Sequence, residues 1–433
     1  MNIYLLLEFV IVLFIMSLVF TRDIFSPSCI MCESYILAVT SAIWNIDKWN
    51  INLHNNTVFI ITIGIFVFCV ISWIINYGYS KNRKYSEEKA EPDFIKYDRK
   101  IIMLLIAAQG ICLIIYIYFF IKALGDLSQY ESLNYMMRYF RFFIDIEKDI
   151  PTVINQLIKI SKAITYVCGF IFIHNKIVAK KLNKKKNENF LLISLIVFAL
   201  MSLLTGGRFE VMILILAMIM MWYIITSIYN NNKTMTISTI MKIIGILIIA
   251  IILFSVMKTI VGRQSEASII DYFTEYFGCS IQIFDIYLQD ENNHITDGRG
   301  ELFADLLKLL EKFKIIESRP DNSELATYVK SNGIVIGNVY TGFRKMIHDF
   351  GMLGVVFFQG LMSVIMTVYY EKIRNKKKIN NISLSIIFYS AIAFTMFLHS
   401  YSEFFYSTII SFNYIAFFAL LFVMKIIVQR VRY

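Results

Sequence analysis

Long apolar runs constrain this chain more than any other feature of its sequence. A helix needs about 20 residues to cross the ~30 Å hydrocarbon core of a membrane, and apolar runs near that length recur along the whole chain. They cover residues 3–20, 58–76, 101–123, 157–178, 190–204, 209–229, 243–260, 350–370, 384–400 and 408–427. Since the 433 residues are 58% hydrophobic and only 17% charged, we predict an all-α, polytopic membrane bundle of about ten transmembrane helices.

Lysine-rich segments set the expected orientation of these helices. Short loops rich in Lys and Arg stay on the cytoplasmic side, and alternate counting brings together "SKNRKYSEEKAEPDFIKYDRK", "KKLNKKKNEN", "EKIRNKKK" and "KIIVQRVRY". We therefore expect both termini in the cytoplasm and a first outer loop at residues 21–57. The expected division is helices 1–7 in residues 1–261, one large outer loop in residues 262–349 and helices 8–10 in residues 350–433. The net charge of +10 follows from the basic loops, so no nucleic-acid partner is expected.

The large outer loop is predicted to be structured. Its stretch "IIDYFTEYFGCSIQIFDIYL" is aromatic, and "ELFADLLKLLEKFKII" repeats leucines at helical spacing, with Glu301 and other charges on the opposite face. The second stretch predicts an amphipathic helix that lies along the headgroups or covers the bundle. In an earlier loop, "NYMMRYFRFF" mixes aromatic residues with Arg138 and Arg141, which fits an interfacial anchor or a sugar-binding segment.

Several kinds of enzyme are excluded by the motifs that the sequence lacks. It contains no Walker A, GxGxxG, HExxH or GxSxG pattern, so nothing indicates ATP hydrolysis, dinucleotide binding, a zinc protease or a serine hydrolase. Any reaction would take its energy from the substrate itself, and no cofactor is expected.

Three arginines lie at the expected outer ends of apolar runs: Arg208 in "TGGRFE", Arg263 in "VGRQSE" and Arg344 in "GFRKMIHDFG". A guanidinium group is permanently charged and offers a planar fork of donors that suits phosphate oxygens. Together the three would hold a diphosphate without a metal, helped by N–H groups of the Gly-Gly turn before Arg208. Glu210 would orient or neutralise Arg208. The alternative is that these arginines snorkel to the outer headgroups.

The stretch "GNVYTGFRKMIHDFGMLG" gathers further polar side chains before an apolar run, with two glycines that permit close helix contact. These side chains are Asn338, Tyr340, Arg344, His348 and Asp349. His348 or Asp349 would accept a proton from a sugar hydroxyl. Asp349 equally suits the N-cap of a helix, and the two roles are compatible.

Two acidic residues and two cysteines carry weaker signals. Asp145 and Glu147 stand one residue apart on an expected outer loop, where paired carboxylates either bind a divalent cation or occur by chance; no metal site is predicted. Cys29 and Cys32 form a CxxC in the first outer loop. They are either a disulfide or redox pair on the oxidising side, or two small, half-buried side chains.

Four stretches of the chain resemble the oligosaccharide repeat-unit polymerases of bacterial surface polysaccharides, called O-antigen polymerases or Wzy. The stretches are "SPSCI", "TGGR", "EYFGCSIQIFD" and, above all, "GNVYTGFRKMIHDFGMLG". The resemblance implies a GT-C-like fold in the bacterial cytoplasmic (inner) membrane, a periplasmic active site and an undecaprenyl-diphosphate-linked oligosaccharide as substrate. It also suggests a membrane-bound regulator of polysaccharide chain length as a partner, besides the membrane lipids.

The resemblance further implies a metal-independent glycosyltransferase of lipopolysaccharide biosynthesis, which moves a growing chain from one lipid diphosphate to the terminal sugar of a second lipid-linked unit. Arg208, Arg263 and Arg344 would stabilise charge on the departing diphosphate, and His348 or Asp349 would take the acceptor proton. Aromatic side chains that would stack on sugars are Tyr272, Tyr276, Phe284 and Tyr340. An O-antigen ligase, which transfers the polysaccharide to another acceptor, and a non-catalytic flippase remain alternatives.

Overall fold

The computed structural model describes residues 2–81, 92–141, 152–205, 207–230, 268–290, 300–317, 328–376 and 378–429. The chain divides into two compact units. Unit 1 comprises Met1–Tyr85, Ala267–Asn375 and Ile392–Ile415, and unit 2 comprises Ser86–Glu266, Lys376–Ala391 and Ala416–Tyr433.

Helices provide almost all of the regular structure in both units. The elements of unit 1 are α1 (Asn2–Thr21), α2 (Pro27–Trp44), α3 (Ile46–Trp49), α4 (Asn55–Lys81), α11 (Ile269–Gln289), α12 (Ala304–Lys312), the antiparallel strands β1 (Val329–Ser331) and β2 (Ile334–Gly337), α13 (Phe343–Arg374), α15 (Phe394–Phe397) and the π-helix η5 (Phe405–Ile409). Those of unit 2 are α5 (Arg99–Leu124), the short η1 (Leu127–Gln129), α6 (Leu133–Tyr139), α7 (Thr152–Lys181), the short η3 (Asn189–Leu191), α8 (Leu192–Leu204), α9 (Phe209–Tyr229), and nearly all of α14 (Leu384–Ile392) and α16 (Phe412–Gln429).

Eight helices in the described ranges are long and apolar enough to cross a membrane. Seven of them, α1, α4, α5, α7, α9, α13 and α16, occupy predicted runs. The runs at 190–204 and 384–400 form shorter apolar helices, and the run at 243–260 lies outside the described residues. The prediction of a helical membrane bundle is therefore confirmed, while its number of crossings stays a prediction.

The remaining span-length helix, α2, occupies the segment that was expected to be an outer loop. Pro27 stands at its first turn, and the hydroxyl of Ser26 accepts a hydrogen bond from the Cys29 N–H at 3.4 Å, a favourable N-terminus. The mean hydropathy of α2 is only 1.2, against 2.8 for α1, because serines and Glu33 interrupt its apolar residues. Helix α2 is instead stabilised by packing against the protein, because 67% of it is buried, mainly against α11 and α1.

A close backbone approach fixes the contact of α2 with α11. A Cβ atom at Gly278 would lie 2.6 Å from the backbone nitrogen of Ala42, far inside van der Waals contact. Glycine is therefore required at this position of α11.

Helix α2 runs back toward the end of unit 1 where α1 begins. The Asn2 amide donates to the Leu53 carbonyl at 2.6 Å and to the Asn55 side chain at 3.0 Å, beside the start of α4. At the other end, Asp23 follows α1 and lies 3.1 Å from Arg374 in the last turn of α13. Three span-length helices, and not two, therefore precede the lysine-rich segment after α4.

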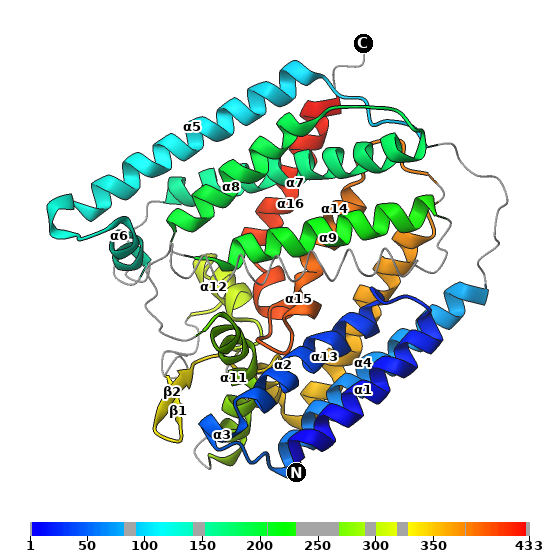
Figure 1. Ribbon diagram of the computed structural model, residues 1–433, viewed down its shortest axis with the longest axis vertical. Coiled ribbons are helices and arrows are strands. Elements are labelled where there is room, and N and C mark those ends of the chain that lie inside the picture. The colour runs from blue at the N-terminus through cyan, green and yellow to red at the C-terminus, as the bar shows by residue number, and fades with distance from the viewer. Residues whose placement is uncertain are drawn as a thin grey trace. The chain divides into compact units, whose positions relative to one another are not determined.

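Helix α13 packs along α4 (Figure 1) and contains a sharp break. Gly351 has φ 63° and ψ −159° inside it, a conformation that is essentially restricted to glycine. A Cβ at Gly354 would lie 2.7 Å from the Met346 carbonyl oxygen, so the two sides of the break are in direct contact. The two glycines fold the first turns of α13 back over the rest of the helix.

The predicted amphipathic helix is present as α12, although it covers only Ala304–Lys312. No residue of α12 is fully buried, and Lys308 pairs with Asp305 at 2.8 Å on its polar face. Leu309 and Phe412 line a small neighbouring cavity of about 180 Å³. The apolar face of α12 is thus only partly covered by the protein.

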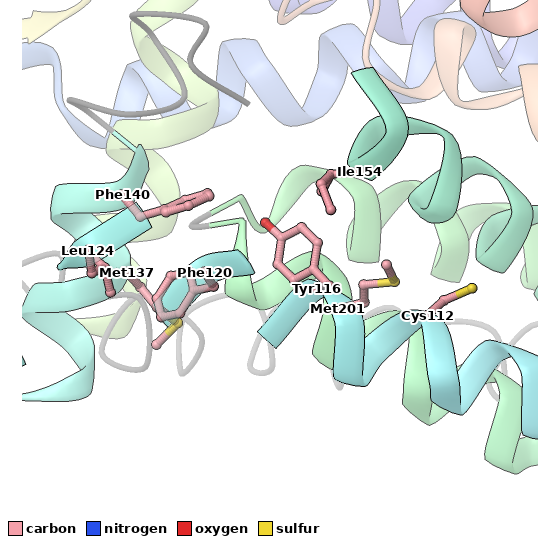
Figure 2. Close-up of a cluster of buried hydrophobic side chains, with 8 residues drawn as sticks. All are labelled: Cys112, Tyr116, Phe120, Leu124, Met137, Phe140, Ile154 and Met201. Atoms are coloured by element: carbon pink, nitrogen blue, oxygen red, sulfur yellow. The ribbon is translucent and has the colours of Figure 1, made fainter. Parts of the chain in front are cut away.

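In unit 2, the part of "NYMMRYFRFF" that the structure describes, residues 134–141, includes most of α6 and packs onto α5. Met137 and Phe140 are buried, whereas Arg138 and Arg141 are exposed, an arrangement compatible with an interfacial anchor. The buried cluster, shown in Figure 2, comprises Cys112, Tyr116, Phe120, Leu124, Met137, Phe140, Ile154 and Met201.

Candidate functional site

Arg344 is the centre of a buried polar network in unit 1. It lies in the first turn of α13, where its two terminal nitrogens contact the two carboxylate oxygens of Glu301 at 3.0 and 2.9 Å. The side chains of Arg344 and Glu301 are 7% and 6% exposed. A bidentate pair of this kind is strong and geometrically specific. Glu301 therefore fills the guanidinium fork that the sequence analysis assigned to a diphosphate.

His348 lies one helical turn after Arg344 and joins the same network. Its Nδ1 is 2.7 Å from the Tyr287 hydroxyl, and its Nε2 is 3.2 Å from the Glu301 carboxylate. Both ring nitrogens are thus engaged, and the residue is only 4% exposed. In this arrangement His348 holds α11, α13 and Glu301 together and has no free nitrogen to accept a substrate proton.

Asp349 follows His348 in α13 and connects that helix to residues 301–302. Its Oδ2 accepts a hydrogen bond from the Leu302 N–H at 2.8 Å. Its Oδ1 is buried and has no hydrogen-bond partner among the described residues. The contact is across the fold to residue 302 and not to the N-terminus of α13, so Asp349 is not the N-cap of that helix.

Two tyrosine rings flank the Arg344 guanidinium. Its central carbon lies 4.6 Å from the ring centroid of Tyr340 and 5.2 Å from that of Tyr287, within cation–π range. Burial is the main cause that raises the pKa of Tyr287 to about 12, although the charge of Arg344 acts in the opposite direction. Burial also raises the pKa of Tyr340. Both hydroxyls therefore stay protonated at neutral pH.

A second buried carboxylate, Glu403, lies beside the start of α13. It accepts hydrogen bonds from the N–H groups of Tyr406 and Ser407 at 2.7 and 2.9 Å, and its carbonyl accepts one from Lys345 at 3.4 Å. Burial is the largest cause that raises the pKa of Glu403, and Lys345 opposes it.

Glu301, Tyr287 and Glu403 were not singled out by the sequence analysis. Glu301 was expected on the solvent face of the amphipathic helix, but it lies before α12 begins and is buried. Its partner Arg344 is 43 residues away in sequence, so no local pattern identifies the pair.

Arg208 belongs to unit 2, at the start of α9, and is 4% exposed. The structure pairs Glu210 with Lys162 of α7 at 2.8 Å. The Gly207 N–H donates to the Thr205 hydroxyl at 3.3 Å, so this donor of the Gly-Gly turn already has a partner. Arg263 lies outside the described residues, and the convergence of the three arginines stays a prediction.

The remaining predicted side chains lie on α11 and near β2. Tyr276 stacks on Tyr401 with ring centroids 5.0 Å apart and also contacts Tyr272. Phe284 is fully buried and packs against Tyr287, so it offers no face to a sugar. Asn338 is half-buried just after β2.

The structure distinguishes the two alternatives for the cysteines, whereas those for the acidic pair Asp145 and Glu147 stay open. All six cysteines lie in described segments and are buried free thiols; Cys32 approaches Cys69 with a sulfur–sulfur distance of 3.6 Å. Cys29 and Cys32 are thus the buried pair of the two alternatives. Within the described ranges no three His, Cys, Asp or Glu side chains group as metal ligands. Asp145 and Glu147 lie outside those ranges.

The chain was compared with protein-family models, with curated proteins and with solved structures, and none of these matches it.

Proposed function

We propose that this chain is a membrane glycosyltransferase that polymerises lipid-diphosphate-linked oligosaccharide repeat units on the outer face of the bacterial cytoplasmic membrane. The observation that carries the proposal is that two of the four stretches resembling such polymerases pack together in unit 1. A Cβ atom at Gly337, the first residue of "GNVYTGFRKMIHDFGMLG", would lie 3.5 Å from Ile283 and 3.6 Å from Cys279 of "EYFGCSIQIFD". Tyr287, just after the second stretch, contacts Arg344 and His348 of the first.

The burial of this network supports a functional role. Taking an arginine and a glutamate out of water costs several kcal/mol per ion, and their attraction offsets this only with good geometry and further hydrogen bonds. Ionisable groups within transmembrane segments are rare and are concentrated at functional sites, and Arg344 and His348 belong to the span-length helix α13. The network includes Arg344, Glu301 and His348, all nearly inaccessible to solvent.

The two arginine-bearing segments receive different roles in this proposal. Because Glu301 occupies the fork of Arg344, we assign Arg344 to positioning of the outer segments, together with His348 and Asp349. Arg208 keeps the proposed contact with the diphosphate, and Arg263 is the second candidate for it. Stabilisation of the departing diphosphate by such donors is electrostatic catalysis.

The proposed orientation of the N-terminus differs from the one expected from the sequence, because α2 adds a crossing. If the lysine-rich segments are cytoplasmic, three crossings by α1, α2 and α4 put the N-terminus on the outer side, beside the start of α4. A cysteine at Asn2, on a background without native cysteines, should then react with an impermeant maleimide in intact cells. A cysteine at Asn187 should not react; the opposite pattern would contradict this orientation.

Reconstitution tests the activity directly. The purified protein in liposomes, supplied with lipid-linked repeat units and no nucleotide, should produce a ladder of polymers, including in excess chelator. Product that forms only when a separate acceptor lipid is added would indicate a ligase. Movement of the substrate across the bilayer without polymer would indicate a flippase.

Arg208 gives the sharpest variant for this assay. Lysine keeps the charge but loses the planar fork, and loss of a preorganised donor costs a factor of roughly 10²–10³ in rate. Arg208→Lys should therefore reduce polymerisation by that factor at normal protein abundance. Arg138→Lys, on the exposed side of α6, is the matched control and should keep full activity. Equal activity of the two variants would remove Arg208 from the mechanism.

A further inference from the structure

A polar cavity lies in unit 1 beside the last turns of α11. Its volume is about 510 Å³, within the range of ~300–1,000 Å³ found for small-ligand sites. Its wall is formed mainly by Asn50, Asn52, His54, Gln282, Asp285 and Gln289. Because none of its eight lining residues is Lys or Arg, the cavity does not suit a diphosphate. Side-chain amides offer both donors and acceptors, which suits a ligand rich in hydroxyl groups.

His54 and Asp285 form a dyad in this wall. Asp285 is 3% exposed. One of its carboxylate oxygens accepts hydrogen bonds from the backbone N–H of His54, at 2.9 Å, and from the Thr57 hydroxyl. The other carboxylate oxygen lies 3.0 Å from His54 Nδ1. A carboxylate at Nδ1 holds the ring proton there, so Nε2 carries the free lone pair.

The exposure of His54 distinguishes it from His348. The His54 side chain is 54% exposed and lines the cavity, whereas both nitrogens of buried His348 are engaged. A base must come within hydrogen-bond reach of the proton that it accepts. Of the two histidines, only His54 meets that requirement.

Gln282 contributes a further polar group to the wall of the cavity. The residue is 6% exposed, and its amide nitrogen donates to the Ser331 hydroxyl at 3.3 Å. Its amide oxygen is buried without a hydrogen-bond partner in the described part of the chain. A buried unpaired acceptor costs about 1–3 kcal/mol, and a ligand hydroxyl would remove that cost.

The cavity and the Arg344 network share one short stretch of α11. Asp285 and Gln289 belong to the cavity, and Tyr287 between them contacts Arg344 and His348. The network therefore fixes the helix turns that also carry the cavity wall.

We propose that this cavity binds the acceptor sugar, with His54 as the base and Asp285 as its positioning residue; the proposal rests on the glycosyltransferase function proposed above. The acceptor hydroxyl gives its proton to His54 Nε2, and its oxygen forms a bond to the anomeric carbon of the donor. The bond from that carbon to the lipid diphosphate breaks, and the diphosphate leaves with the electron pair. His54 then releases its proton to water.

Kinetics of the full-length protein in liposomes test the catalytic half. His54→Gln should lower kcat by roughly 10²–10⁴ with little change in KM. Asp285→Asn should also lower kcat, and the double variant should be no slower than His54→Gln, because Asp285 acts through His54. A merely structural Asp285 would instead add its effect to that of His54→Gln. Wild-type kcat in His54→Gln would overturn the assignment of the base.

Binding of the repeat-unit oligosaccharide, released from its lipid, tests the cavity separately. Saturation-transfer NMR should show binding to the wild type and to His54→Gln. Asn52→Ala, in the wall, should weaken it, and exposed Asn187→Ala in unit 2 should not. Equal binding by all four proteins would overturn the cavity as the sugar site. If the wild type binds but makes no polymer, the proposed function fails while the sugar site stands.

Discussion

Two buried arginines stand at opposite ends of α13, and their surroundings differ. Arg344, at the start, is bidentate to Glu301 and lies beside two tyrosine rings and the engaged ring of His348. Arg374, at the end, lies 3.1 Å from Asp23 and 3.8 Å from Glu371.

The partners of these arginines indicate what each cluster stabilises. The Arg374 cluster joins the connection between α1 and α2 to α13, and Asn76 of α4 donates to Glu371 at 2.8 Å. It thus holds span-length helices in register. The Arg344 cluster instead holds segments that connect helices, next to the polar cavity. Under the proposed function, the Arg344 cluster should therefore affect both activity and stability, and the Arg374 cluster stability alone.

Removal of one carboxylate should have the largest effect on stability. Glu301→Ala leaves Arg344 as a buried charge without its bidentate partner, which typically costs ~3–5 kcal/mol. Asp23→Ala should cost less, because Glu371 remains near Arg374. Denaturant titration in detergent micelles measures both free energies of unfolding. Equal losses would mean that the two clusters are energetically equivalent.

Replacement of both charges by amides should separate stability from activity. Arg344→Gln with Glu301→Gln removes the ion pair without leaving a lone charge, and we expect polymerisation to fall about 10²-fold, as for a misplacement of about 1 Å at the reacting groups. Arg374→Gln with Asp23→Asn makes the same change in the other cluster and should keep the rate near that of the wild type. Rates and protein abundance in liposomes decide between the two roles. An active first variant would make both clusters structural.

The break in α13 should matter less. Gly351→Ala places a side chain in a conformation that costs ~1–3 kcal/mol for other residues, at the break between the first turns of α13 and the rest of the helix. Gly110→Ala, where a Cβ meets nothing within 4 Å, is the control and should be neutral or slightly stabilising. The free energies of unfolding of the two variants check this, and a neutral Gly351→Ala would contradict it.

Single tyrosine hydroxyls should give the smallest difference. Tyr370 donates to the Asp23 carboxylate, and the Tyr287 hydroxyl contacts His348. A hydrogen bond to a charged group contributes ~1.5–3 kcal/mol and a neutral one ~0.5–1.5 kcal/mol. Tyr370→Phe should therefore lower the free energy of unfolding more than Tyr287→Phe. The reverse order would imply a charged His348.

Uniformly apolar helices were predictable from the sequence, and helices that depend on packing were not. Helix α1 has a mean hydropathy of 2.8 and coincides with a predicted run, whereas α2 was missed at 1.2. Its membership in the bundle depends on contacts such as that of Gly278 with Ala42. Those contacts join residues far apart in sequence and leave no periodic pattern.

The candidate site was predictable only in part, again because its contacts join residues that are far apart in sequence. The motif around Arg344 and His348 contains the right chemical groups, but their partners Glu301 and Tyr287 come from segments with different expected roles. The proximity of His54 to Asp285 depends on a hydrogen bond across 231 residues. Arg374 lies in a basic segment that suggests a cytoplasmic surface, yet it is 6% exposed.

The reliance of α2 on α11 has a consequence for biosynthesis. About 225 residues separate the end of α2 from the start of α11, and a ribosome adds ~5–20 residues per second. Roughly 10–50 s therefore pass before the main packing partner of α2 leaves the ribosome. During that interval a weakly apolar helix carrying Glu33 must be sheltered by α1, α4 or the insertion machinery. Early assembly of the N-terminal helices is thus a vulnerable step in the synthesis of this protein.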